Sequence, residues 1–203
     1  PTLLFLIGKQ KNLRLSSVIT KMIKAICFDL DGVYFTPEGK KSFHEGLISE
    51  YGIGREVIDE FMYRSQEMAK LVRGQMSPKE FWDSLRLLTG ISTSDQELAN
   101  RWVRDYEIDQ NVRNVVLKTR EMGYKTCVCT NNNEIRLPAL EKKFHFMADF
   151  DCIVSSHEIG HTKPSKEIFL ELLKRLDILP EELIYSDDNP ERLKGAIELG
   201  INT

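Results

Sequence analysis

The sequence has no basic block, no long apolar run and only four cysteines. Without a cluster of Lys and Arg, and with a net charge of −3, nothing in it indicates binding to nucleic acid. Without a run of about 20 apolar residues, we expect no membrane-spanning helix. The composition, 41% apolar and 29% charged, is that of an ordinary soluble globular protein.

The four cysteines lie within segments that we predict to be strands: Cys27, Cys127, Cys129 and Cys152. In that setting they serve as small buried apolar residues, and we expect reduced thiols and a cytoplasmic protein. A zinc site is disfavoured, because a single residue between Cys127 and Cys129 is not the usual spacing of zinc ligands.

The most informative segment is an apolar strand pattern, starting at Ile26, that ends in the two aspartates Asp29 and Asp31. Two like charges so close together at the end of a buried strand are costly without a cation. Side chains alternate along a strand, so Asp29 and Asp31 leave the same face, and Gly32 lets the backbone turn sharply there. This arrangement suits a divalent cation and a nucleophile that share one strand end.

The rest of the chain alternates predicted strands and helices. We expect strands at 24–30, 125–130, 151–155 and 182–186, and helices near 112–122, 168–176 and 191–199. This alternation predicts an α/β fold with a Rossmann-like parallel sheet core and helices on both faces. Ligands of such a sheet bind at the carboxyl ends of its strands. Polar residues end each strand: Asp29, Asp31, Thr130, Asn131, Ser155, Ser156, Asp187 and Asp188.

A long insertion separates the first two strands, because one crossover helix needs far fewer residues than this interval contains. Its apolar residues keep a helical spacing, and Ser77 and Ser94 each precede a glutamate by three residues, which is a capping pattern. We expect about four helices over 36–108, with Phe81, Trp82 and Trp102 in their apolar core. The core would then consist of 22–35 and 109–203, joined to the insertion near 35–42 and 106–110.

The two ends of the chain depart from this pattern. Residues 1–21 precede Met22 with a short apolar run and a basic stretch. We expect an N-terminal extension there, with an ordered arm packed on the core as the alternative. A further strand is expected after Gly200, where the chain stops at Thr203, so we expect a missing sheet edge or a truncation.

Four motifs occur in order on the predicted strand ends and the loops between them: Asp29-Leu30-Asp31-Gly32-Val33, Thr130-Asn131, Gly160-His161-Thr162-Lys163-Pro164 and Asp187-Asp188-Asn189. With a helical insertion between the first two, they resemble the haloacid dehalogenase-like hydrolase superfamily over roughly Met22 to Thr203. The insertion is similar to the helical cap domain of its first subclass. The likeness is greatest to its sugar-phosphate phosphatases, including the glucose-1-phosphate phosphatase branch.

The resemblance implies a Mg²⁺-dependent hydrolase of small phosphate monoesters. It implies that Asp29 attacks phosphorus to form an aspartyl-phosphate, while Asp31 acts first as acid and then as base. Mg²⁺ would be bound by Asp29, the backbone carbonyl of Asp31, and Asp188. Asp187 would contact these ligands and not the ion itself. The residues expected to bind the phosphate are Thr130, Asn131 and Lys163.

One residue departs from the family pattern. Four residues after Asp188 the family commonly has Asn or Asp, whereas this chain has Arg192. The departure bears on the metal site and leaves open a catalytically impaired binding module. A phosphomutase on the same scaffold also stays open, whereas a dehalogenase is disfavoured because attack on a carbon–halogen bond needs no acid/base such as Asp31.

The insertion is expected to close over the site and to provide specificity contacts. The candidates for contact with a small phosphorylated substrate are Tyr34, Phe35, His44 and Arg73. The sequence indicates neither the identity of the phosphate ester nor the oligomeric state.

Overall fold

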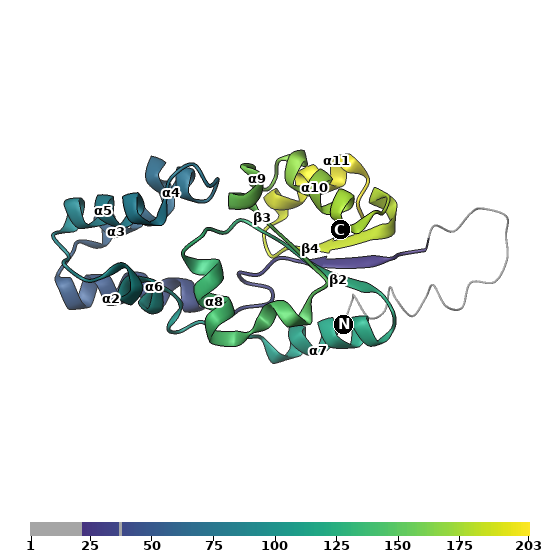
Figure 1. The fold of residues 1–203 in the computed structure, drawn as a ribbon, viewed down its shortest axis with the longest axis horizontal. Helices are drawn as coiled ribbons and strands as arrows, with labels where there is room; N and C mark the ends of the chain where they lie inside the picture. The colour runs from purple at the N-terminus through teal and green to yellow at the C-terminus, as the bar shows by residue number, and fades with distance from the viewer. Residues whose placement is uncertain (1–21, 37) are drawn as a thin grey trace.

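The computed structural model describes residues 22–36 and 38–203. The extension expected at 1–21 lies outside the described residues. Along the described chain a sheet with helices on both sides forms one end of the molecule, and a group of helices forms the other (Figure 1). No helix within the described ranges combines the length and the apolar character needed to cross a bilayer.

The sheet has four strands in the order β3-β2-β1-β4. The strands are β1 (Ala25–Phe28), β2 (Lys125–Thr130), β3 (Cys152–Ser155) and β4 (Leu183–Ser186). All neighbouring pairs are parallel, so the carboxyl ends of the four strands lie at one edge. The predicted α/β fold class is confirmed. Strand β1 ends at Phe28, two residues before the expected end, and the Asp29 amide still donates to the Ser186 carbonyl at the end of β4.

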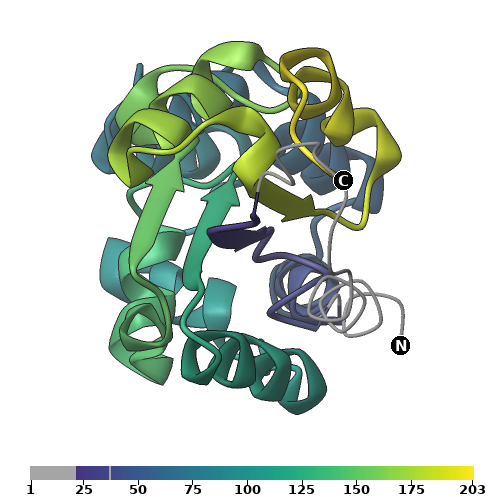
Figure 2. The same ribbon diagram turned by 90° about the vertical axis from the view of Figure 1, so that its right-hand side faces the viewer.

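Helices cover both faces of the sheet, as Figure 2 shows. Ile26 and Phe28 of β1 pack into one apolar cluster with helices α7 (Gln110–Glu121) and α8 (Arg136–Phe144). Ala25 and Cys27 point to the other face, towards α10 (Lys166–Leu176) and α11 (Lys194–Leu199). This alternation explains why β1 is apolar along its whole length. All four cysteines are free thiols.

The remaining short segments lie close to the strand ends. They are α9 (Ser156–Ile159) and the 3₁₀ turns η2 (Phe146–Asp149), η3 (Pro180–Glu182) and η4 (Pro190–Leu193). The expected helix at 191–199 is therefore divided into η4 and α11. Asn189 caps the 3₁₀ turn through its side chain, and Pro190 begins it, as is common at helix starts.

The insertion is helical. Its helices are α2 (Glu38–Tyr51), α3 (Arg55–Asp59), α4 (Gln66–Leu71), α5 (Pro78–Thr89) and α6 (Asp95–Val103), with a π-helical turn η1 (Glu60–Arg64) after α3. The expected number was about four. One more appears because Ser65 breaks the helical pattern and caps α4, where its side chain accepts a hydrogen bond from the Met68 amide.

Local signals in the insertion act as the residue types predict. Ser77 and Glu80 form a reciprocal capping box at the start of α5, and Ser94 caps α6 by accepting from the Glu97 amide. Phe81 and Trp82 are almost completely buried together with Trp102, which confirms their place in the apolar core of the insertion. This cluster also includes Ile135 of the sheet core, so the two parts pack against each other.

The two connections between sheet and insertion pair with each other. Phe35 and Ile108 form an antiparallel bridge, and Asp109 donates its amide hydrogen bond to the Tyr34 carbonyl. Tyr34 and Phe35 are fully buried in the aromatic cluster of the sheet core. Their predicted contact with a substrate is therefore wrong, because both rings lie in the core beneath the connection.

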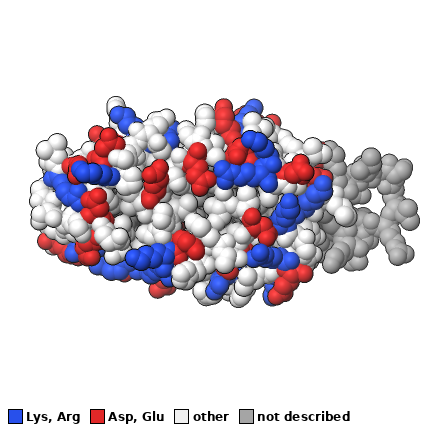
Figure 3. All heavy atoms as spheres, in the orientation of Figure 1, with Lys and Arg blue, Asp and Glu red and all other residues white. Residues whose placement is uncertain are grey.

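The surface carries charges of both signs. On the face in Figure 3, Lys and Arg are interspersed with Asp and Glu over both parts of the molecule.

At the C-terminal end Asn202 forms a single parallel bridge with Ile184 of β4, where a further strand was expected.

Gly74 lies where the insertion meets the core, and it offers a test of that contact. Its φ is +64°, and a Cβ there would lie 2.2 Å from the carbonyl oxygen of His157. We expect Gly74→Ala to lower the free energy of unfolding by about 2–3 kcal/mol, which thermal or urea denaturation would measure. Gly90→Ala is the matched control, because its φ is +75° but nothing lies within 4 Å of the added carbon. Equal losses in the two variants would contradict a rigid contact at Gly74.

Candidate active site

Residues from all the predicted motifs meet at the carboxyl edge of the sheet. Asp29 and Asp31 follow β1, Thr130 ends β2, and Asp187 follows β4. A cavity of about 210 Å³ lies beside them, between the core and the insertion. It is lined by Asp31, Asn131, Asn133, Arg136 and Arg192 of the core and by His44, Met62, Tyr63, Met68, Val72 and Trp102 of the insertion.

A buried ammonium group connects the ends of β1 and β4. Nζ of Lys163 lies 2.9 Å from Oδ1 of Asp29 and 2.6 Å from Oδ2 of Asp187, and it donates to the Tyr185 hydroxyl at 2.8 Å. The Lys163 side chain is fully buried. Burial disfavours its charge, but the two carboxylates outweigh burial and raise the pKa of Lys163. The group therefore stays cationic at neutral pH.

Asp29 and Asp187 share Lys163, but their pKa values shift in opposite directions. Burial raises the pKa of Asp29, and the attraction of Lys163 offsets this only in part, because Asp187 and Asp31 are also nearby. Burial likewise opposes ionisation of Asp187, yet Lys163 and hydrogen bonds from Lys163 and Tyr185 lower its pKa below the ordinary value. Of these two carboxylates, Asp29 is the one whose charged form an additional cation would favour more.

Three carboxylates could hold such a cation. Oxygens of Asp29, Asp187 and Asp188 lie within 4.8 Å of one another. A Cβ on Gly32 would lie 2.4 Å from Oδ2 of Asp188, so the glycine lets this carboxylate approach the backbone beside Asp31. Carboxylate and carbonyl oxygens are the ligands that Mg²⁺ takes, so this set of donors fits that ion.

The three carboxylates are not equally accessible. Oδ2 of Asp187 accepts from Lys163 and Tyr185, and its Oδ1 accepts from the Asn189 amide at 2.9 Å. Asp188 is exposed. The structure thus brings Asp29 and Asp188 together, and the Asp187 oxygens are engaged by donors of the protein.

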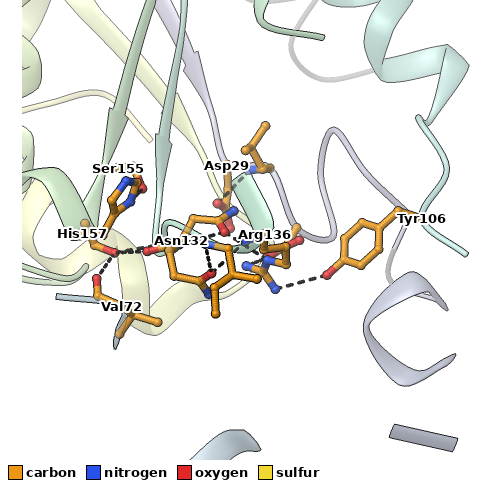
Figure 4. A network of polar contacts seen from close by, with 12 residues as sticks. Asp29, Val72, Tyr106, Asn132, Arg136, Ser155 and His157 are labelled. Carbon is orange, nitrogen blue, oxygen red and sulfur yellow. Dashed lines mark hydrogen bonds and ion pairs between the residues drawn. The ribbon is translucent and has the colours of Figure 1, made fainter. Parts of the chain in front are cut away.

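The Asp31 carboxylate turns towards an arginine that the sequence analysis did not identify. Arg136 donates from Nη2 to Oδ2 of Asp31 at 2.5 Å, from Nε to Asn132 at 3.0 Å and from Nη1 to the Tyr106 hydroxyl at 3.1 Å (Figure 4). Its guanidinium also lies 5.8 Å from the ring centre of Trp102 in the insertion. No sequence pattern identifies Arg136 as a residue of the site, because a charged residue at the start of a helix is ordinarily solvated.

Thr130 and Asn131 have different surroundings. The Thr130 hydroxyl is buried and has no hydrogen-bond partner within the described parts of the chain, as suits a donor reserved for a ligand oxygen. The Asn131 side chain is already engaged: Oδ1 accepts from the Lys163 amide at 2.7 Å, and Nδ2 donates to the Lys163 carbonyl at 3.2 Å. Asn131 therefore fixes the loop that carries Lys163, in addition to lining the cavity.

The insertion contacts the core beside this site. Ser156 accepts a hydrogen bond from the Asn132 amide at 3.1 Å and donates to the Val72 carbonyl at 2.6 Å (Figure 4). His44 is buried and lines the cavity as expected, and burial lowers its pKa against the opposing effect of Asp59. Arg73 instead extends towards Thr162, whose hydroxyl is 3.4 Å away.

Comparisons with known proteins agree with this geometry. A family model described as haloacid dehalogenase-like hydrolase matches residues 23–200. The chain is 26% identical over 195 residues to a glyceraldehyde 3-phosphate phosphatase of Methanopyrus kandleri, covering 90% of this chain and 83% of the relative. It is 25% identical over 189 residues to a D-ribitol-5-phosphate phosphatase of Bacteroides thetaiotaomicron, covering 90% and 91%.

A solved structure matches both the sheet and the insertion. It is a HAD family enzyme from Bacteroides thetaiotaomicron, in complex with magnesium and inorganic phosphate, with a TM-score of 0.74 and 27% identity. The alignment covers 89% of this chain and 92% of the neighbour. The similarity therefore extends over nearly the whole of both chains.

The buried ion pairs of Lys163 predict a large effect on stability. Lys163→Met would leave Asp29 and Asp187 without their shared cation, and we expect the free energy of unfolding to fall by about 3–5 kcal/mol. Urea denaturation in the presence of EDTA would measure the loss. Lys166→Met is the control from the same segment, because its ion pair with Glu198 is half exposed and should contribute less than about 1 kcal/mol. Similar losses in the two variants would contradict a structural role for the buried pairs.

Proposed function

The chain belongs to the haloacid dehalogenase-like hydrolases, and on this premise we propose that it hydrolyses small phosphate monoesters with Asp29 as the nucleophile. One observation carries the proposal. Asp29 is 1% exposed, is ion-paired with a fully buried lysine, and lies at the sheet edge beside the cavity. A carboxylate held next to a cation in so dry a place is poised for attack on phosphorus, because few waters have to be removed from it.

The positive charges around Asp29 counter the charge of the substrate. A phosphate monoester is close to doubly negative at neutral pH, so a carboxylate can approach it only where cations offset the repulsion. Lys163 provides one such charge, and the unpartnered hydroxyl of Thr130 can donate to a phosphoryl oxygen. Mg²⁺ held by Asp29, Asp188 and the Asp31 carbonyl would supply further charge stabilisation as a Lewis acid.

Asp31 would move the protons in both halves of the reaction. It protonates the leaving oxygen when Asp29 forms the aspartyl-phosphate, and it then deprotonates the water that cleaves this intermediate. Its carboxylate lines the cavity and is oriented by Arg136, whose hydrogen bonds to Asn132 and Tyr106 fix the guanidinium. Arg136 therefore acts through Asp31, as a positioning residue.

We place the substrate among small sugar phosphates. The two phosphatases that the chain resembles are named for glyceraldehyde 3-phosphate and D-ribitol 5-phosphate, which are phosphate esters of a triose and of a five-carbon sugar alcohol. A cavity of about 210 Å³ suits a molecule of that size. The four free thiols fit a reducing compartment, and we assign the protein to the cytoplasm.

The proposal predicts release of p-nitrophenol from p-nitrophenyl phosphate in the presence of Mg²⁺, with loss of activity on adding EDTA. Asp29→Asn should lower kcat by roughly a thousandfold or more, because it removes the nucleophile. Asp83→Asn makes the same chemical change on an exposed part of α5 and should leave kcat unchanged. Activity that survives Asp29→Asn would refute the assignment.

A panel of sugar phosphates would identify the substrate class. Inorganic phosphate should appear in proportion to the ester consumed. Formation of an isomeric sugar phosphate without release of phosphate would instead identify a phosphomutase.

A further inference from the structure

Arg192 occupies the one place where the motifs of this chain depart from the family pattern, and it contacts the proposed nucleophile. Its Nη1 donates to Oδ2 of Asp29 at 3.2 Å. The other oxygen of Asp29, Oδ1, pairs with Lys163 and accepts from the Leu30 amide at 2.7 Å. Both oxygens of this buried carboxylate therefore have donors from the protein.

The contact of Arg192 lies where a metal ligand is expected. Asp29 is one of the three carboxylates whose oxygens lie within 4.8 Å of one another, and Oδ1 is already engaged by Lys163. Oδ2 is thus the oxygen of Asp29 left for a cation. A guanidinium and a divalent cation cannot both bind it closely, because like charges at such a distance repel strongly in a poorly hydrated site.

The three cations of the site are held to different degrees. Lys163 is fully buried between two carboxylates. The Arg136 side chain is 10% exposed and donates three hydrogen bonds. Arg192 is 29% exposed, and within the described residues Asp29 is the only hydrogen-bond partner of its guanidinium. It extends from the short 3₁₀ turn η4 at the surface. Arg192 is therefore the cation that can leave most easily.

We propose that Arg192 is a displaceable counter-cation, which neutralises Asp29 in the metal-free protein and competes with Mg²⁺ for Oδ2 of that carboxylate. When the metal binds, the guanidinium withdraws into the cavity, which Arg192 already lines together with Asp31 and Asn131. The positive charge then stays next to the place where a phosphate ester would bind. The inference rests on the proposed function only in taking Mg²⁺ as the metal.

The competition is tested by calorimetric titration of Mg²⁺ into the protein without substrate. Arg192→Asn removes the competing guanidinium, and we expect the Kd for Mg²⁺ to fall roughly tenfold or more, because a charge-assisted hydrogen bond no longer has to be broken. Lys194→Asn is the matched control: it removes one positive charge from the next turn, where Lys194 pairs with Glu191. Its Kd should stay within about twofold of the wild-type value. An unchanged or higher Kd for Arg192→Asn would overturn the proposal.

Thermal denaturation separates competition from a purely structural role. In EDTA, Arg192→Asn should lower Tm, because Asp29 loses a partner, whereas in saturating Mg²⁺ the difference from wild type should vanish. A structural role would lower Tm equally in both conditions and would overturn the proposal. Neither measurement depends on turnover. A protein without phosphatase activity that shows the tighter Mg²⁺ binding would refute the proposed function alone.

Discussion

The fully buried ammonium of Lys163 is the contact on which the geometry of the site depends. It pairs with Asp29 after β1 and with Asp187 after β4, two neighbouring parallel strands. Because a buried charge is tolerated only with well-placed partners, these two carboxylates and the lysine have to be present together. The side-chain amide of Asn131 forms two hydrogen bonds with the backbone of Lys163, one to its carbonyl and one from its amide. These bonds connect the loop that carries Lys163 to the end of β2. Lys163 thereby contacts residues at the ends of three strands.

The site distributes its charges between fixed and movable groups. Lys163 and Arg136 are buried and hydrogen-bonded on several sides, so they hold Asp29 and Asp31 in place. Arg192 is partly exposed, and among the described residues its guanidinium has one hydrogen-bond partner, Asp29. A site of this kind can stay folded without its metal, because the protein itself neutralises much of the carboxylate charge. Its affinity for a metal is set by what the ion has to displace.

The insertion lines the cavity and also packs against core residues of the site. Trp102 belongs to the apolar core of the insertion, and Arg136 of the sheet core lies over its ring. Ser156 hydrogen-bonds to both parts, through Asn132 and Val72. The orientation of Asp31 is therefore coupled, by way of Arg136, to how the insertion rests on the core. The cavity lies between the two parts, so a ligand bound in it would contact both.

The sequence alone predicted the four strands in chain order, a helical insertion between the first two, and the carboxylates at the strand ends, but it did not predict helix α8. Each predicted feature depends on local periodicity, on turn residues such as Gly32, or on motifs read within a few positions. Only the tertiary structure decided the partners of those carboxylates. Arg136 is 105 residues from Asp31 and Arg192 is 163 residues from Asp29, separations at which no residue pattern signals contact. Tyr34 and Phe35 were misjudged for the same reason: an aromatic pair near a motif resembles a substrate contact until the packing of distant segments around it is known.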